Sequence, residues 1–141
     1  MSTPAELLAH RAPMLLLDDI VAVDGSSIAA QVHIGPHSPF FDGVGVPSYV
    51  GLEYMAQACG AYVGALARSA GRAPRIGYLL GTRNFVTHVG RFASGDRLDV
   101  GASCVYSDGE MGVFECRIRR SDVVVAEAQL NVYQPPEPRD G

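Results

Sequence analysis

The stretch that decides the fold is PSYVGLEYMAQACGAYVGALARS, residues 47–69. Between Tyr49 and Ala67 it carries one formal charge, on Glu53, and one other strongly polar side chain, on Gln57. Its apolar residues extend round every side of a helix. About 22 residues at a rise of 1.5 Å each make a rod of about 33 Å. The stretch therefore predicts one long helix that other parts of the molecule must cover.

The cover for this helix is expected from strands rather than from lipid. A charge at Glu53 and several glycines inside the span argue against a membrane helix. In the rest of the chain, Phe114, Cys116 and Ile118 alternate with charged residues, which is typical of a strand with one buried face. Strand-like patterns occupy residues 14–24, 27–35, 76–88, 97–108, 111–120 and 123–133. We predict an α+β fold in which a curved antiparallel sheet wraps the long central helix.

The domain organisation is expected to be simple. The chain has 141 residues, which is enough for one hydrophobic core. No repeat or long linker divides it, so we expect a single domain over residues 1–134 and a flexible tail over 135–141. The predicted order is a short helix, two strands, the long helix and four strands. Such a sheet has exposed edges, and because pairing would hide them we expect a dimer.

The composition limits the classes of function. The formal net charge is −4, so the basic face that nucleic-acid binding requires is not expected. Histidines and carboxylates show no metal-ligand spacing, and we expect no metal site. Cys59, Cys104 and Cys116 contain no CxxC pair, which predicts small buried side chains in a reducing compartment. Since no secretory signal is visible, we expect a cytoplasmic protein.

Glu53 and Gln57 are the polar residues that need an explanation. They are four residues apart, so they lie on one face of the helix. One interpretation is a carboxylate that the helix dipole favours, with a hydrogen bond from Gln57. The other is a carboxyl group in an apolar cavity, whose pKa is raised by desolvation so that it can exchange a proton near neutral pH. The sequence leaves both interpretations open.

Three stretches carry a family resemblance: HRAPMLLLDDI at 10–20, PFFDGVGVPSYVGLEYMAQACG at 39–60, and LLGTRNF at 79–85, followed by Gly95-Asp96. They resemble the 3-hydroxyacyl-acyl carrier protein dehydratases of the FabA/FabZ type. The segment GVGVPSYVGLEYMAQ and the LLGTR strand are most similar to the ApeP-like dehydratases of aryl polyene biosynthesis. The resemblance implies the hotdog fold, usually dimeric, and acyl thioesters carried on the phosphopantetheine of acyl carrier protein, with no further cofactor.

The resemblance also implies roles for individual residues. In the family, a helix carboxyl group protonates the departing hydroxyl, which places this role on Glu53, and the amide four residues later corresponds to Gln57. Amides near Tyr49, Val50 and Gly51 would polarise the thioester carbonyl. We therefore expect Gln57, Tyr49 and Gly51 to contact the substrate.

Arg83 lies within an otherwise apolar strand. It has two interpretations. It either contacts the phosphopantetheine arm or the substrate, or its guanidinium reaches the rim of the sheet or pairs with a carboxylate, Glu53 or Asp42.

The family's catalytic histidine is missing, because the loop runs directly from Phe41-Asp42-Gly43 to Val46-Pro47. His37, two residues before the PFF segment, is the first candidate for the base. Asp42 is a second candidate as a base or a water-holding group, and the remaining histidines His10, His33 and His88 are weaker candidates.

Three functions remain open. The first is a dehydratase that converts a carrier-bound 3-hydroxyacyl thioester to the enoyl form, with Glu53 as acid and His37 as base. The second, motivated by the missing histidine, is a non-catalytic partner subunit of a heterodimeric dehydratase, so that the dimer is a homodimer or a heterodimer. The third is an acyl thioesterase, since hotdog thioesterases can use a helix carboxylate and a water molecule.

Overall fold

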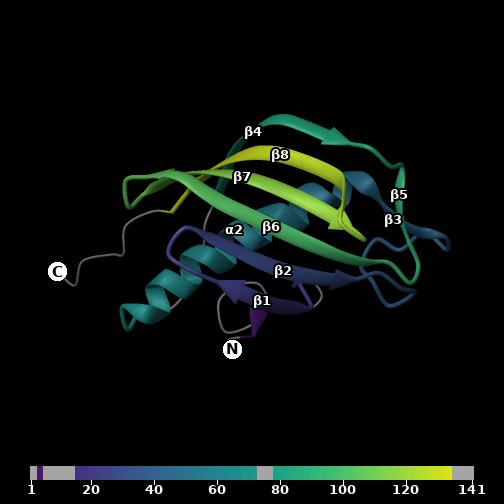
Figure 1. Ribbon diagram of the computed structural model, residues 1–141, viewed down its shortest axis with the longest axis horizontal. Coiled ribbons are helices and arrows are strands. Elements are labelled where there is room, and N and C mark those ends of the chain that lie inside the picture. Colours follow the sequence, from purple (N-terminus) through teal and green to yellow (C-terminus); the bar gives the residue numbers. More distant parts are fainter. Residues whose placement is uncertain (1–2, 5–14, 73–77, 135–141) are drawn as a thin grey trace.

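A computed structural model describes residues 3–4, 15–72 and 78–134 (Figure 1). In chain order the elements are β1 (Asp19–Val23), β2 (Ser27–His33), β3 (Gly45–Pro47), the one-turn helix η1 (Ser48–Val50), α2 (Gly51–Ser69), β4 (Tyr78–Thr87), β5 (Arg91–Ala93), β6 (Arg97–Ser107), β7 (Met111–Arg120) and β8 (Val123–Tyr133). The predicted long helix and the α+β class are confirmed.

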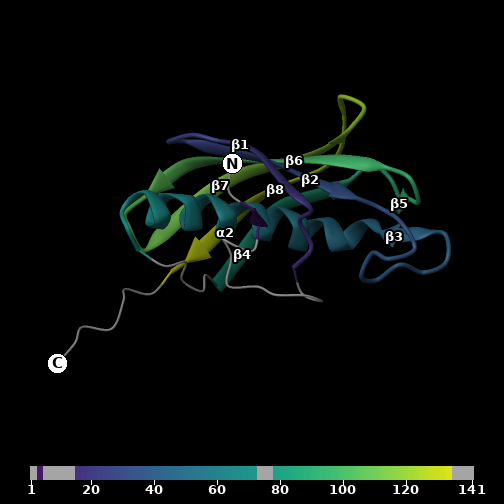
Figure 2. The ribbon, with the colours of Figure 1, turned by 90° about the horizontal axis from the view of Figure 1, so that it is seen from below.

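The main sheet has six strands in the order β1-β2-β6-β7-β8-β4, and every neighbouring pair is antiparallel. It curves over α2, which contacts β2, β6, β7 and β8 (Figure 2). Phe114, Cys116 and Ile118 of β7 are buried, whereas Glu115 and Arg117 are exposed. The alternation in the sequence therefore distinguishes the face of the sheet that covers the helix from the outer face.

The predicted element list needs two changes. Strands β3 and β5 form a separate two-stranded sheet that the sequence analysis did not predict. The strand predicted from Met14 begins only at Asp19, because Leu16 bonds to the helix instead of to a strand. The predicted short N-terminal helix and the tail 135–141 lie outside the described residues, apart from Pro4.

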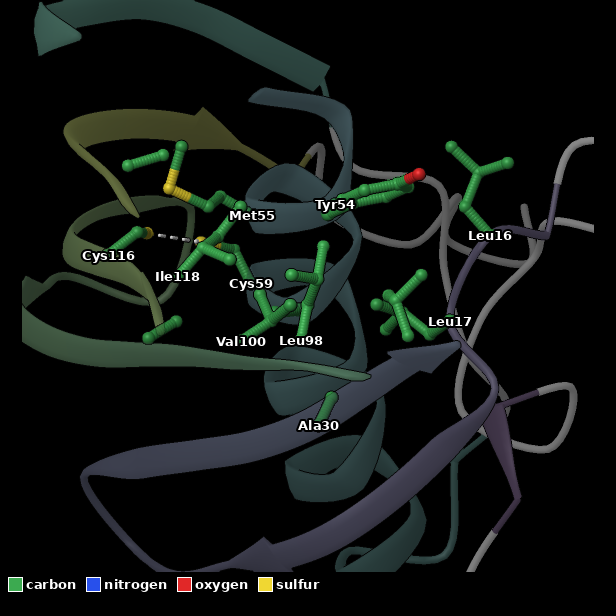
Figure 3. Close-up of a cluster of buried hydrophobic side chains, with 14 of the residues drawn as sticks. Leu16, Leu17, Ala30, Tyr54, Met55, Cys59, Leu98, Val100, Cys116 and Ile118 are labelled. Carbon is green, nitrogen blue, oxygen red and sulfur yellow. Dashed lines mark hydrogen bonds between the residues drawn. The ribbon is translucent and has the colours of Figure 1, made fainter. Parts of the chain in front are cut away.

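The core lies between α2 and the sheet (Figure 3). Cys59 of α2 and Cys116 of β7 are both buried, with their sulfur atoms 3.6 Å apart. Burial, and then the neighbouring Cys116, raise the pKa of the Cys59 thiol. The prediction of buried free thiols is correct for these two residues and wrong for Cys104, which is partly exposed.

The two edges of the main sheet differ. The β1 edge is five residues long, and it begins with Asp19. The β4 edge is ten residues long and exposes Leu79, Leu80 and Val86. Natural proteins shorten or charge their free sheet edges, so β4 has the features of an edge that another chain covers.

No helix in the described ranges combines the length and the hydropathy needed to cross a bilayer.

Candidate active site on the central helix

Glu53 lies in the first turn of α2 and is partly buried. Its carboxylate oxygen Oε1 accepts a hydrogen bond from Nε2 of Gln57 at 3.4 Å. The neighbouring positions on this side of the helix, Leu52, Ala56 and Gly60, are also only partly buried. The site therefore presents a carboxyl group on an apolar helix face that this chain covers incompletely.

Gln57 holds this carboxyl group in place. Its side chain is 1% exposed, and its Oε1 accepts a hydrogen bond from the backbone N–H of Leu16 at 2.8 Å. The amide thus bridges the segment that enters β1 and the carboxyl group of Glu53. Gln57 was predicted to contact substrate, and its contacts in this chain point to a positioning role.

Replacing Gln57 by Met is expected to lower the free energy of unfolding by about 1–3 kcal/mol, because the N–H of Leu16 loses its buried acceptor. Urea titration followed by circular dichroism measures this change, and Gln129→Met on the partly buried outer side of β8 serves as the control. Equal stability of the two variants would show that the Leu16 contact contributes nothing.

The start of the helix is fixed by close packing. The backbone N–H of Ser48 donates to the carbonyl of Gly90 at 3.0 Å, and the N–H of Gly51 donates to carbonyls of η1. A Cβ atom on Gly51 would lie 3.0 Å from Ile118 and 3.1 Å from Phe92. Gly51 is therefore required for packing, and its amide, predicted to bind the substrate carbonyl, is already engaged within the turn.

Tyr49 lies beside this turn, and its side chain is 68% exposed. It projects from η1, immediately before the turn of α2 that carries Glu53. An exposed aromatic side chain at this point is available to a bound molecule. Its predicted contact with substrate stays a prediction.

Asp42, the second candidate for a base or water-holding group, has a structural role in this chain. Its Oδ1 accepts hydrogen bonds from the N–H groups of Val44 and Gly45, both at 3.0 Å, and its Oδ2 lies 2.6 Å from Nε of Arg91. The bond from Gly45, followed by the Arg91 contact, lowers the pKa of Asp42 to about 2. Such a carboxylate is a weak proton acceptor at neutral pH, and it fastens the loop before β3 to β5.

The Asp42 contacts predict a pH effect on stability. The pKa in the folded state is about 2, below the ordinary value of 3.8, so the contribution is present above pH 3.8 and is lost as the pH falls through about 2. The stability difference between wild type and Asp42→Asn is therefore expected to shrink as the pH falls from about 4 to about 2. Urea midpoints across this range measure it, with Asp122→Asn in the β7–β8 turn as control. A pH-independent difference would contradict the prediction.

The predicted base His37 lies in the exposed turn after β2. It lines a cavity together with Tyr54 of α2, and Glu53 is not among the described residues that line this cavity. The structure thus does not bring His37 to Glu53 in this cavity, and the role of His37 as base stays a prediction.

The other histidines have separate surroundings. His33 Nε2 lies 3.1 Å from Oδ2 of Asp19. His88 Nε2 lies 3.9 Å from Oε2 of Glu127, on the outer face of the sheet. Both are exposed, and His10 lies outside the described residues.

Arg83 lies on the edge strand β4, opposite Gln129 of β8, and is exposed. Its suggested pairing with Asp42 is wrong, because that carboxylate bonds to Arg91. Within the described part of the chain, no ion pair joins Arg83 to Glu53 either. Its predicted contact with substrate stays a prediction.

Among the described residues, no three histidine, cysteine or carboxylate side chains gather as metal ligands would.

A long helix that bears a carboxyl group near its start, wrapped by a curved antiparallel sheet, places this chain among the hotdog-fold proteins. The chain belongs to the ApeP-like dehydratase family, because its residues 2–140 match the family described as ApeP dehydratase.

Relatives and solved structures agree with this assignment. The 3-hydroxyacyl-[acyl-carrier-protein] dehydratase FabZ of Agrobacterium fabrum is 30% identical over 142 residues, covering 94% of this chain and 87% of the relative. A chain of the dehydratase heterocomplex ApeI:P from Xenorhabdus doucetiae superposes with a TM-score of 0.92 at 31% identity, covering 97% of this chain and 93% of that one. A hypothetical thioesterase from Streptococcus pneumoniae, at 13% identity and a TM-score of 0.66 over 86% of this chain and 88% of its own, shows the shared fold.

Proposed function

We propose that this chain acts in the removal of water from a 3-hydroxyacyl thioester carried by acyl carrier protein, with Glu53 protonating the departing hydroxyl. The observation that carries the proposal is the carboxyl group of Glu53, which Gln57 holds on an incompletely covered apolar face of the central helix. The family match and the name of the Agrobacterium fabrum relative support the reaction and the carrier.

The chemistry requires two groups on opposite sides of the substrate. A base removes the proton next to the thioester carbonyl, and an acid supplies a proton to the hydroxyl as the carbon–oxygen bond breaks. Glu53 is suited to the second step because it lies on an apolar surface, where a closed site excludes water. The amide of Gly51 is engaged within the turn, so the amides of Tyr49 and Val50 are the remaining candidates to polarise the carbonyl.

The base is supplied by a second hotdog chain that covers the Glu53 face. Three features support this part of the proposal: the incomplete cover of Leu52 and Gly60, the ten-residue β4 edge with its exposed apolar side chains, and the placement of His37 in a cavity lined by Tyr54. The similar Xenorhabdus doucetiae structure is a heterocomplex. This chain would then be one subunit of a heterodimer and would contribute the acid to a shared site.

Purified chain, its companion hotdog subunit and their equimolar mixture are each incubated with a 3-hydroxyacyl carrier protein. The intact mass of the carrier is then measured. We expect the mixture to remove one water and the chain alone to be inactive. Robust water loss by the isolated chain would indicate that its own His37 is the base. Release of the free acid and the carrier thiol would identify a thioesterase. An intact substrate in every arm would contradict the dehydratase proposal.

The cysteines bear on the cellular compartment in which the protein acts. The three cysteines are free, and two of them are buried close together without a bond. Free thiols persist in a reducing compartment, which supports a cytoplasmic location.

A further inference from the structure

A cavity of about 250 Å³ lies beside the helix at a place that the proposed reaction does not use. Its apolar walls are Leu15, Leu16, Val32 and Pro39. They come from the segment that enters β1, the end of β2 and the turn after it. A single water molecule occupies about 30 Å³ of liquid, so this cavity has room for a small organic group.

The floor of the cavity carries a buried hydroxyl group. Tyr54 is 2% exposed and its ring packs on Phe92, with the ring centres 6.0 Å apart. Figure 3 shows its oxygen pointing away from Met55 and toward Leu16. No described residue makes a hydrogen bond to this hydroxyl. Buried hydroxyl groups in folded proteins normally have a partner, so this one points to a bound molecule.

The turn that lines the cavity after β2 is also built by specific contacts. The ring of His37 lies over Gly35, where a Cβ atom would come within 3.0 Å of two ring atoms. Ser38 fixes the same turn, because its hydroxyl accepts from the N–H of Gly35 at 3.0 Å and donates to the carbonyl of His33 at 3.3 Å. His37 thus lies in a turn that Ser38 fixes, and it lines the same cavity as Tyr54.

The charge at the cavity limits what can bind. The carboxylate of Asp18 lines it and accepts a hydrogen bond from the N–H of His33 at 2.7 Å. Burial, and then the charge of Asp18, raise the pKa of Tyr54. The hydroxyl thus remains a protonated donor at neutral pH, while the same carboxylate disfavours an anion.

We propose that the cavity between Tyr54, His37 and Asp18 is a binding site for a small uncharged group that carries a hydroxyl or carbonyl oxygen. That oxygen accepts a hydrogen bond from Tyr54, and the apolar part of the group lies against Leu15, Val32 and Pro39. The side chain of Tyr54 leaves the helix about 100° away from that of Glu53. Gln57 lies between these two directions, and its side chain bonds to the backbone of Leu16. The site therefore stands independently of the role of Glu53.

The direct test is NMR titration of the purified chain with n-butanol, butanone and butyrate, observing the backbone amides of Gly35 and Ser38. We expect saturable shifts with the alcohol and the ketone, and binding of butyrate at least about fivefold weaker because of Asp18. Tyr54→Phe should weaken binding of n-butanol about fivefold, since one hydrogen bond is lost. Tyr62→Phe is the matched control, because that hydroxyl donates to the carbonyl of Gly25 elsewhere.

The outcomes separate clearly. The site would be overturned by the absence of saturable shifts, or by equal affinity of Tyr54→Phe and wild type for n-butanol. Equal affinity of the wild type for butyrate and n-butanol would overturn the preference for uncharged groups. The melting temperature of Tyr54→Phe should be at or above that of wild type, so loss of binding is separable from loss of fold. A second arm measures the KM of the carrier-bound substrate with n-butanol present. A raised KM assigns the oxygen to the carried substrate, and an unchanged KM assigns it to a separate ligand.

Discussion

Replacing Glu53 by Gln is expected to lower the rate of water loss at least about a hundredfold, because general acid catalysis contributes about 10²–10⁴ in rate. Gln is close to Glu in shape and can still contact Gln57, but its amide N–H groups are far too weakly acidic to protonate the departing hydroxyl. The measurement is the rate at which the two-subunit complex converts a 3-hydroxyacyl carrier protein to the enoyl form.

The control for this variant is Glu115→Gln, an exposed residue on the outer face of β7. Circular dichroism and the mass of the complex should be unchanged in both variants, because neither substitution removes packing. If the Glu53→Gln complex removes water as fast as the Glu115→Gln complex, the carboxyl group of Glu53 does not act in the mechanism.

Replacing Leu80 by Lys is expected to break the association with the second chain. Leu80 is 58% exposed on the β4 edge and is the extra residue at an irregularity between Leu79 and Gly81. A lysine there adds an unpaired charge to a surface that the complex buries. The dissociation constant should rise at least about a hundredfold, which corresponds to about 2.7 kcal/mol.

Light scattering after size-exclusion chromatography measures this change as a fall from the mass of the complex to that of the single chains. Val123→Lys is the matched control, because Val123 is also apolar and 63% exposed but lies on β8, at the β7–β8 turn. Activity should fall together with the mass for Leu80→Lys. If the Leu80→Lys complex stays intact, the partner does not use the β4 edge.

The parts of the fold that depend on local pattern were predictable from the sequence. The predicted strands 111–120 and 123–133 coincide with β7 and β8, since alternation over ten residues is a strong pattern. The long helix was predicted from a different pattern, an apolar stretch in which Glu53 is the only formal charge between Tyr49 and Ala67. Strands β3 and β5 are three residues each and pair across more than 40 positions, so no period of their own could reveal them.

The candidate site was predictable only in part. Glu53 and Gln57 were found because polar residues are conspicuous in an apolar helix. The contact of Gln57 with Leu16 joins residues 41 positions apart, and such a pairing has no local pattern. Tyr54 has no distinctive pattern in the sequence, because an aromatic residue in an apolar stretch is normally part of the core. Asp42 was named as a second candidate for a base or water-holding group, and its bonds to Gly45 and Arg91 could not be anticipated because they depend on the folded loop.

The central claim, that Glu53 gives its proton to the leaving hydroxyl, is tested most directly by changing the leaving group. A 3-chloroacyl carrier thioester expels chloride, which leaves without being protonated. We predict that the Glu53→Gln complex, slow on the 3-hydroxyacyl substrate, eliminates chloride at nearly the wild-type rate above the spontaneous background. An equal loss of rate on both substrates would contradict the account, because the carboxyl group would then act in some way other than as the acid.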